Sequence, residues 1–311
     1  MNSTLQIAQL KVSPSRRFDK TSDGRLAHLY KLKNRNGLEV TITNYDARLL
    51  SLLITNRNGN LIDVIAGSDK VLQLNAVKGM AQGVIWDARQ INDHTVELHY
   101  PKKSMAGNLK AKVTYLLKDD NGLKITFEIN SDTKIVINPA DLIAFNLNGR
   151  NNGNILNHQV WIKADNYLPV DANMVVTAKT EPVVNTPFDF RNSATIGSRI
   201  SDHHVQLTNG NGYNHNFVLN KHASRTPVAR VMGDKSGIIM EIFTDQPGLQ
   251  FYSGNVIQTQ LGGVGEKDDA HAAFAMRIGA FFDLLPRVQD PPPLQKAAHT
   301  HRYVTCYQLK K

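Results

Sequence analysis

LAHLYKLKNRNGLEVTITNY, residues 26–45, is the stretch of sequence that decides the fold. Apolar and polar side chains alternate in residues 26–32 and again in residues 38–45, which is the period of a half-buried β-strand. The segment between them, residues 34–37, reads NRNG and is rich in residues that favour turns. Two alternating runs on either side of such a segment predict an antiparallel hairpin.

The same pattern recurs along the chain. Alternating runs at residues 49–55 and 61–65 flank a polar turn at residues 56–60. Further strands are expected at residues 95–100, 110–117, 123–129 and 303–309. Many short strands broken by Asn, Asp and Gly predict an all-β protein, a large antiparallel β-sandwich. The alternative is an α+β chain with helices near residues 71–77 or 295–301.

The domain organisation expected from the sequence is simple. Residues 1–25 are polar and rich in Ser and Arg, which indicates a flexible or edge-lying lead-in. No repeat and no Gly- or Ser-rich linker divides residues 26–311, so we expect a single β-sandwich domain there. The prolines at residues 291–293 predict a rigid extended connector before the last strand.

Composition limits the class of protein. The chain has 311 residues and a single cysteine, Cys306, so it contains no internal disulfide and no Cys-rich zinc site. No apolar run approaches the roughly 20 residues of a membrane helix, and the first residues lack the apolar stretch of a signal peptide. These features predict an intracellular protein, cytoplasmic or nuclear, with no membrane segment.

The net charge is +9, from 36 Lys and Arg against 27 Asp and Glu. Such an excess favours acidic partners in general. The basic residues do not alternate with aromatic residues that could stack on bases, so specific nucleic-acid recognition is not expected.

From residue 145 onward the chain contains a series of distinctive segments. They are FNLNG (145–149), ILNHQVWIKADNYLPVD (155–171), NTPFDFR (185–191), IG (196–197), GYNHNFVL (212–219) and DQPGLQFYSGN (245–255). In this order and spacing they resemble the aldose 1-epimerase (galactose mutarotase) family, and residues 37–67 are similar to the opening hairpins of that family. The resemblance covers most of the chain and implies a large antiparallel β-sandwich, in agreement with the alternating runs.

The resemblance also implies a chemistry. Members of the family interconvert the α and β anomers of a free sugar, with a glutamate as general base and a histidine as general acid, and need no metal or nucleotide. The position that matches the histidine holds Leu142, beside Asp141, and the position that matches the glutamate holds Arg277. Leucine carries no proton to transfer, and arginine, with a pKa above about 12, stays protonated.

Other positions of the resembling site have also changed. The family's sugar-holding aspartate corresponds to Asn214, whereas its glutamine is retained as Gln250. Residues 68–82 contain neither the asparagine-arginine pair nor the second histidine that the family carries there. The candidate residual pocket therefore consists of Asp141, Asn146, Asn214, Gln250 and Arg277. Asp141 would need a β-bulge to enter it.

The histidines suggest no metal site. His203 and His204 are adjacent, and adjacent residues on a strand would point to opposite faces, so no metal ligand set is predicted. They are interpreted as part of a solvated turn. His215 follows the family pattern and is interpreted as a structural, hydrogen-bonding residue.

Three hypotheses for the function follow. In the first, the chain is a catalytically inactive relative of the family, a pseudoenzyme that acts as a binding or scaffolding module for a protein partner with an acidic segment. In the second, it binds a carbohydrate, acidic or phosphorylated, through Arg277. In the third, it is a residual aldose 1-epimerase that uses relocated groups.

Overall fold

The computed structural model describes residues 26–66, 83–101, 110–130, 143–177, 179–255, 270–279 and 300–311. Several sequence-based expectations lie outside these residues. They are the lead-in at residues 1–25, the alternative helix at residues 71–77, the proline connector at residues 291–293, Asp141 and Leu142.

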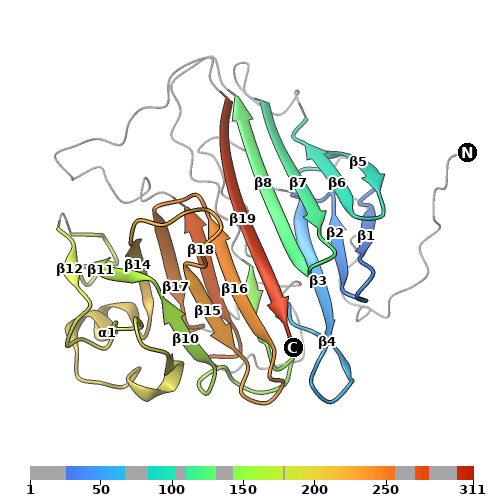
Figure 1. Ribbon diagram of the computed structural model, residues 1–311. Helices are drawn as coiled ribbons and strands as arrows, with labels where there is room; N and C mark the ends of the chain where they lie inside the picture. The colour runs from blue at the N-terminus through green and yellow to red at the C-terminus, as the bar shows by residue number, and fades with distance from the viewer. Residues whose placement is uncertain are drawn as a thin grey trace, which may run out of the picture.

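The largest element is an antiparallel sheet of nine strands in the order β13-β10-β15-β16-β19-β8-β7-β6-β5 (Figure 1). Its strands are β5 (Asp87–Asn92), β6 (Thr95–His99), β7 (Lys110–Leu117), β8 (Gly122–Asn130), β10 (Gln159–Ile162), β13 (Ala194–Thr195), β15 (Ala229–Met232), β16 (Ile239–Thr244) and β19 (Thr300–Lys310). The last strand, β19, pairs with β8 on one side and β16 on the other, so it joins the two halves of this sheet.

Two smaller sheets complete the part of the fold that the structure describes. The four-stranded sheet consists of β1 (Leu29–Lys33), β2 (Glu39–Thr43), β3 (Arg48–Thr55) and β4 (Leu61–Asp63). The six-stranded sheet has the order β12-β11-β14-β17-β18-β9. Its strands are β9 (Ala144–Phe145), β11 (Ala164–Leu168), β12 (Glu181–Pro182), β14 (Asn214–Leu219), β17 (Gly248–Tyr252) and β18 (Phe274–Gly279).

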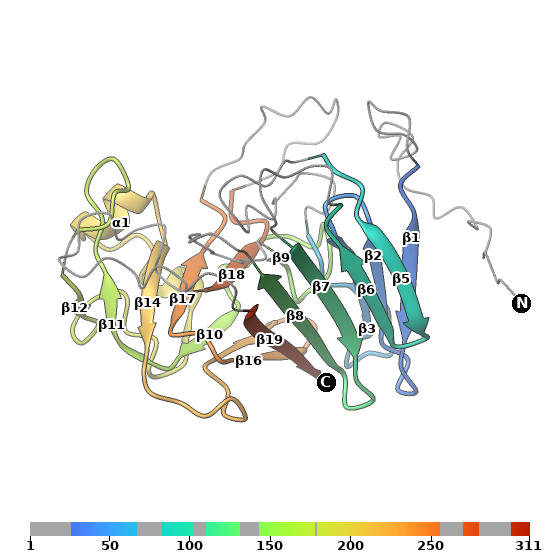
Figure 2. The same cartoon turned by 90° about the horizontal axis from the view of Figure 1, so that it is seen from above.

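The two smaller sheets meet along the chain that follows β4. Ile65 forms an antiparallel bridge with Phe145 of β9, flanked by hydrogen bonds between the Ala66 amide and the Ala144 carbonyl and between the Asn146 amide and the Val64 carbonyl. In Figures 1 and 2 the four-stranded sheet lies beside β5 to β8, and the six-stranded sheet lies beside β10, β15 and β16. The fold is therefore an extended β-sandwich, as the alternating sequence runs predict.

The core is the apolar layer between these sheets. Phe145 of β9 is fully buried, and its ring lies 5.9 Å from the ring of Phe274 in β18 and 5.3 Å from the ring of Tyr307 in β19. This contact joins the six-stranded sheet to the nine-stranded sheet. Burying large aromatic side chains contributes strongly to the stability of such interfaces.

The sequence predicts most of the early strands closely. The expected run at residues 110–117 is β7, and the hairpin expected at residues 26–45 is formed by β1 and β2. The last strand is longer than expected, because β19 begins at Thr300 and not at residue 303. The alternative helix at residues 295–301 is wrong where it is described, because residues 300 and 301 belong to β19.

One short helix was not expected. Helix α1 (Val205–Gly210) begins after His204, whose Nδ1 atom accepts a hydrogen bond from the Gln206 amide. His203 and His204 therefore do not lie on a strand; they lie in the irregular segment that leads into α1. His204 is the N-cap of α1, where a side-chain acceptor satisfies an amide that the first turn leaves open.

Replacing Phe145 with alanine tests the link between the layers. The variant Phe145→Ala leaves a cavity between the two sheets, and we expect the free energy of unfolding, measured by urea denaturation, to fall by about 3–5 kcal/mol. Leu61, whose side chain is 54% exposed in β4, is the control, and Leu61→Ala changes stability by less than about 0.5 kcal/mol. Equal effects of the two substitutions would contradict this account of the core.

Candidate functional site

The candidate site lies on the side of the six-stranded sheet that faces away from the core. Strands β14, β17 and β18 are paired antiparallel, and successive side chains on each strand point to opposite faces. Phe217, Phe251 and Met276 occupy the inner face and are buried. The opposite face carries a set of polar, partly exposed side chains that we call the polar face, formed by Asn214, Asn216, Gln250, Tyr252 and Arg277.

The pairing register places these side chains close together. Gln250 lies between Asn216 on one neighbouring strand and Arg277 on the other, directly opposite each of them. Residues in such positions have Cβ atoms about 4.5–5.5 Å apart. The Nε2 atom of Gln250 donates a hydrogen bond of 3.0 Å to the Oδ1 atom of Asn214. The structure therefore brings together three of the residues expected in the pocket, Asn214, Gln250 and Arg277.

Arg277 gives the polar face its charge. The residue is partly exposed while its Nε atom is buried, so the guanidinium is partly shielded from water. None of the strand positions that form the polar face within the described residues is Asp or Glu. A partly desolvated cation interacts more strongly with an anion than an exposed one does.

Beside Arg277, the next cross-strand pair on the same face of β17 and β18 consists of two glycines. Gly279 lies two residues beyond Arg277 on β18, and it pairs with Gly248 of β17. Both glycines therefore fall on the same side of the sheet as Arg277. This side of the guanidinium is not covered by a side chain of β17 or β18.

The polar face was identified only in part from the sequence. Asn216 and Tyr252 were missed, although each lies two residues from a residue that was named, Asn214 and Gln250 respectively. The alternation of strand side chains is the signal that places Asn216 beside Asn214 and Tyr252 beside Gln250.

Asn146 has a different role from the one expected. Its side chain is fully buried and donates hydrogen bonds from Nδ2 to the carbonyls of Gly153 and Ala272, while Oδ1 accepts from the Asn148 amide. All these partners are backbone groups. Asn146 thus holds neighbouring loops together and has no exposed surface to offer a ligand.

His215 is structural, as the sequence predicts. It is fully buried on the inner face, where Nδ1 accepts a hydrogen bond from the Asn214 amide and Nε2 lies 3.1 Å from Oε1 of Gln206. Burial lowers the pKa of His215 to about 4, with a smaller contribution from His204. The ring is neutral near pH 7, and both of its nitrogens are used.

A second buried histidine, His158, also remains neutral. Its Nε2 atom accepts a hydrogen bond of 3.0 Å from the Leu147 amide, and Nδ1 lies 3.4 Å from Oδ1 of Asp234. Burial lowers its pKa to about 4, although Asp234 acts in the opposite direction. The burial penalty for a charged imidazole outweighs the attraction of one partly exposed carboxylate.

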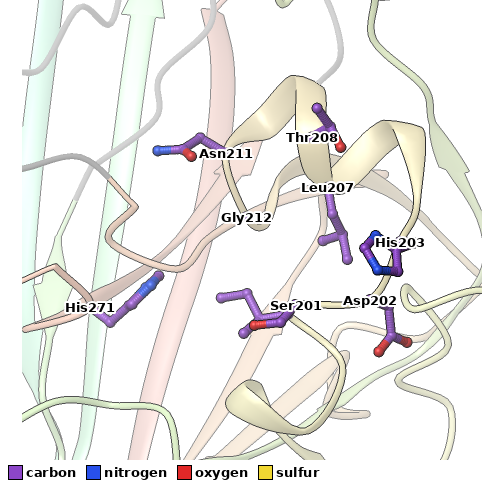
Figure 3. A pocket seen from close by; sticks show the side chains of 9 residues that line it. Ser201, Asp202, His203, Leu207, Thr208, Asn211, Gly212 and His271 are labelled. Carbon is purple, nitrogen blue, oxygen red and sulfur yellow. The ribbon is translucent and has the colours of Figure 1, made fainter.

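A separate hollow of about 300 Å³ lies near α1 (Figure 3). His271, which precedes β18, lies across it from Asp202 and His203, and its Nδ1 atom lies 2.7 Å from the Ser253 carbonyl. The remaining lining residues are Ile200, Ser201, Leu207, Thr208, Asn211 and Gly212. No residue of the polar face lines this hollow.

The described residues also bear on metal binding and on membrane insertion. In the ranges that the structure covers, no group of three or more His, Cys, Asp and Glu side chains is placed to hold a metal ion. No helix in the same ranges has the length and apolar character needed to cross a membrane.

Comparison with known proteins gives consistent matches. A sequence model described as aldose 1-epimerase matches residues 73–308. Galactose mutarotase of Sus scrofa is 31% identical over 263 residues, which cover 84% of this chain and 72% of the relative. Aldose 1-epimerase of Escherichia coli (strain K12) is 28% identical over 282 residues, and the match covers 76% of this chain and 81% of the relative.

Solved structures show the same fold. Galactose 1-epimerase from Lactobacillus acidophilus NCFM superposes with a TM-score of 0.75 and 21% identity, covering 93% of this chain and 96% of that chain. A GalM/aldose epimerase homologue from C. elegans has a TM-score of 0.74 and 18% identity, covering 91% of this chain and 99% of that chain.

The buried histidines predict a loss of stability in acid. Above pH 6.5 both rings are neutral in the folded and unfolded chains. Below pH 6.5 the two histidines are protonated in the unfolded chain but stay neutral in the folded chain. The free energy of unfolding therefore falls with falling pH until the folded pKa values near 4 are reached. Each histidine contributes roughly 3 kcal/mol over this window.

Urea denaturation between pH 7 and pH 4.5 measures this effect. In His215→Gln, the slope of the unfolding free energy against pH should be smaller by about 1.4 kcal/mol per pH unit. His99, whose side chain is 52% exposed, provides the control, and His99→Gln should keep the parent slope. A His215→Gln slope equal to that of the parent would show that His215 is not buried in its neutral form.

Proposed function

We propose that this chain, which belongs to the aldose 1-epimerase family, is a non-catalytic member that binds a sugar on the polar face. The observation that carries the proposal is Arg277, which stands opposite Gln250 at the position where the sequence resemblance places the general base. Under this proposal the chain keeps the fold of the family but has lost the proton transfer.

Arg277 cannot replace a carboxylate base. Opening a sugar ring requires removal of a proton from the anomeric hydroxyl and delivery of a proton to the ring oxygen. A guanidinium has N–H donors but no acceptor, and it stays protonated at any pH at which the protein is folded. At this position it holds hydrogen-bond acceptors and removes no proton.

Among the described residues, the polar face carries no histidine and no carboxyl group at the place of the missing histidine. The resemblance places the acid at Leu142, which lies outside the described residues. His215 is adjacent to Asn214 in sequence, but its ring is buried on the opposite side of the sheet with both nitrogens engaged. Loss of an acid or a base lowers rates by about 10²–10⁴-fold each, so losing both removes nearly all of the catalytic advantage.

The remaining groups suit binding. Asn214, Asn216 and Gln250 are neutral amides that both donate and accept hydrogen bonds, as recognition of sugar hydroxyls requires. Two of them are already held in place by the hydrogen bond between Gln250 and Asn214. The similar proteins are named for galactose and for aldoses, and on that basis we take a free sugar as the ligand.

Two further functions stay predictions. A scaffolding function for a protein partner with an acidic segment is supported by the net charge of +9. Residual aldose 1-epimerase activity would require an acid and a base outside the positions named by the resemblance, and the experiment below tests it directly.

Polarimetry on freshly dissolved α-galactose tests the proposal. With micromolar protein, we expect the optical rotation to relax at the rate of the buffer alone, because the polar face supplies no general base. An active aldose 1-epimerase run in the same buffer is the positive control. Relaxation well above the buffer rate, abolished by Asn214→Ala, would contradict the proposal and favour residual epimerase activity.

A further inference from the structure

We infer that Gln206 and His215 are positioning residues for the polar face, because together they hold Asn214, the first residue of β14, in the orientation in which it meets a sugar. The inference rests on the proposed sugar-binding function and adds to it two buried residues from outside the polar face. Three features carry it: the fixed orientation of the Gln206 side chain, the tautomer that this orientation imposes on His215, and the dependence of the Asn214 amide on that tautomer.

The side chain of Gln206 has one orientation that satisfies its neighbours. It is buried in the first turn of α1, where Oε1 accepts a hydrogen bond of 2.7 Å from the Val170 amide and Nε2 donates one of 3.0 Å to the Val170 carbonyl. Exchanging the oxygen and the nitrogen would place donor against donor and acceptor against acceptor. Oε1 of Gln206 is therefore an acceptor for any further group that it contacts.

That further group is Nε2 of His215, which lies 3.1 Å from Oε1 of Gln206. The ring is neutral near pH 7, because burial lowers its pKa to about 4. Since a carbonyl oxygen can only accept, the single ring proton lies on Nε2, and Nδ1 keeps a lone pair. Nδ1 accepts a hydrogen bond of 3.2 Å from the Asn214 amide. Gln206 thus sets which nitrogen of His215 faces Asn214.

Packing holds the His215 ring in this position. The ring lies against Phe188, with 4.6 Å between the two ring centroids, and Gly210 at the end of α1 lies close to its Cε1 atom. A Cβ atom at position 210 would lie 3.0 Å from Cε1, which is tighter than most such contacts. Glycine at this position therefore allows α1 to approach the ring closely.

The Asn214 amide depends on His215, because neither neighbouring strand accepts a hydrogen bond from it in the part of the chain that the structure describes. The Ser253 amide donates to the Tyr213 carbonyl, and hydrogen bonding to one neighbour alternates along an antiparallel strand, so the Asn214 amide turns away from β17. On the other side, the pairing of β14 with β11 extends only to Asn216. Nδ1 of His215 takes the place of a strand acceptor.

The backbone of Asn214 in turn orients its side chain on the polar face. Oδ1 of Asn214 accepts a hydrogen bond from Nε2 of Gln250, which leaves Nδ2 of Asn214 to donate to a sugar oxygen. Without the bond to His215, the first residue of β14 can rotate, and Nδ2 no longer keeps one direction. Loss of one such oriented hydrogen bond weakens galactose binding by about three- to tenfold.

Two substitutions of His215 separate positioning from stability. Asparagine places a side-chain oxygen where Nδ1 of histidine lies, whereas glutamine reaches the place of Nε2. In calorimetric titration with galactose, His215→Asn should keep the parent affinity within about twofold, and His215→Gln should bind about three- to tenfold more weakly. Both variants lose the packing of the ring, so a role limited to stability would change the two affinities alike.

A second variant keeps every hydrogen-bonding group. In Gly210→Ala the added Cβ atom displaces the His215 ring, and we expect weaker galactose binding by a folded protein. The controls are His99→Asn and His99→Gln, at an exposed position of β6, and both should bind galactose as the parent does. Circular dichroism and thermal unfolding establish that each variant is folded.

Nitrogen chemical shifts of the His215 ring test the hydrogen-bond chain without a ligand. At pH 7 we expect Nε2 to be protonated and Nδ1 to be unprotonated in the parent protein. A proton on Nδ1 would overturn the inference, as would equal galactose affinities of His215→Asn and His215→Gln. Displaced ring shifts in Gly210→Ala together with the parent affinity would also overturn it. Absence of galactose binding by a parent protein that carries the proton on Nε2 would overturn the proposed function and leave the hydrogen-bond chain standing.

Discussion

Burial of the inner faces of β14, β17 and β18 is the constraint on which the rest of the structure depends. Phe217, Phe251 and Met276 must face the core, and their burial removes large apolar areas from water. A shift of one residue in any of these strands would turn its apolar set outward, so burial fixes the pairing register. The same register places Gln250 opposite Arg277 on the other face. The core therefore determines which side chains meet on the polar face.

Because the two faces alternate, the polar face can change without loss of the fold. A substitution from a carboxylate to arginine on the outward side leaves the packing of the inward neighbours, such as Met276 and Ile278, as it was. The chain belongs to the aldose 1-epimerase family. This independence gives a physical reason why its fold can persist while Arg277 stands at the position that the sequence resemblance matches to the base. In the proposed change from proton transfer to recognition, the same strands would orient Arg277 in place of a reacting group.

The sequence predicts the fold well because alternation and turns are local signals, as β1, β2 and β7 show. It identifies Asn214, Gln250 and Arg277 through segments that surround them. Asn216 and Tyr252 require the cross-strand register, which is a property of the folded sheet. The burial of Asn146 depends on carbonyls as distant as that of Ala272, which no local pattern reveals. The capping of α1 by His204 was not predicted, because it becomes visible only in the hydrogen bond to the Gln206 amide.

The central claim is that the family fold persists here without the family chemistry. Exchange spectroscopy by nuclear magnetic resonance, on the anomeric protons of an aldose mixed with near-stoichiometric protein, tests it most directly because slow or residual interconversion remains visible at high protein concentration. The account predicts no magnetisation transfer between the α and β signals beyond that in buffer, for neutral and charged sugars alike. Transfer that grows with protein concentration would contradict it, because proton transfer would then proceed without the expected base.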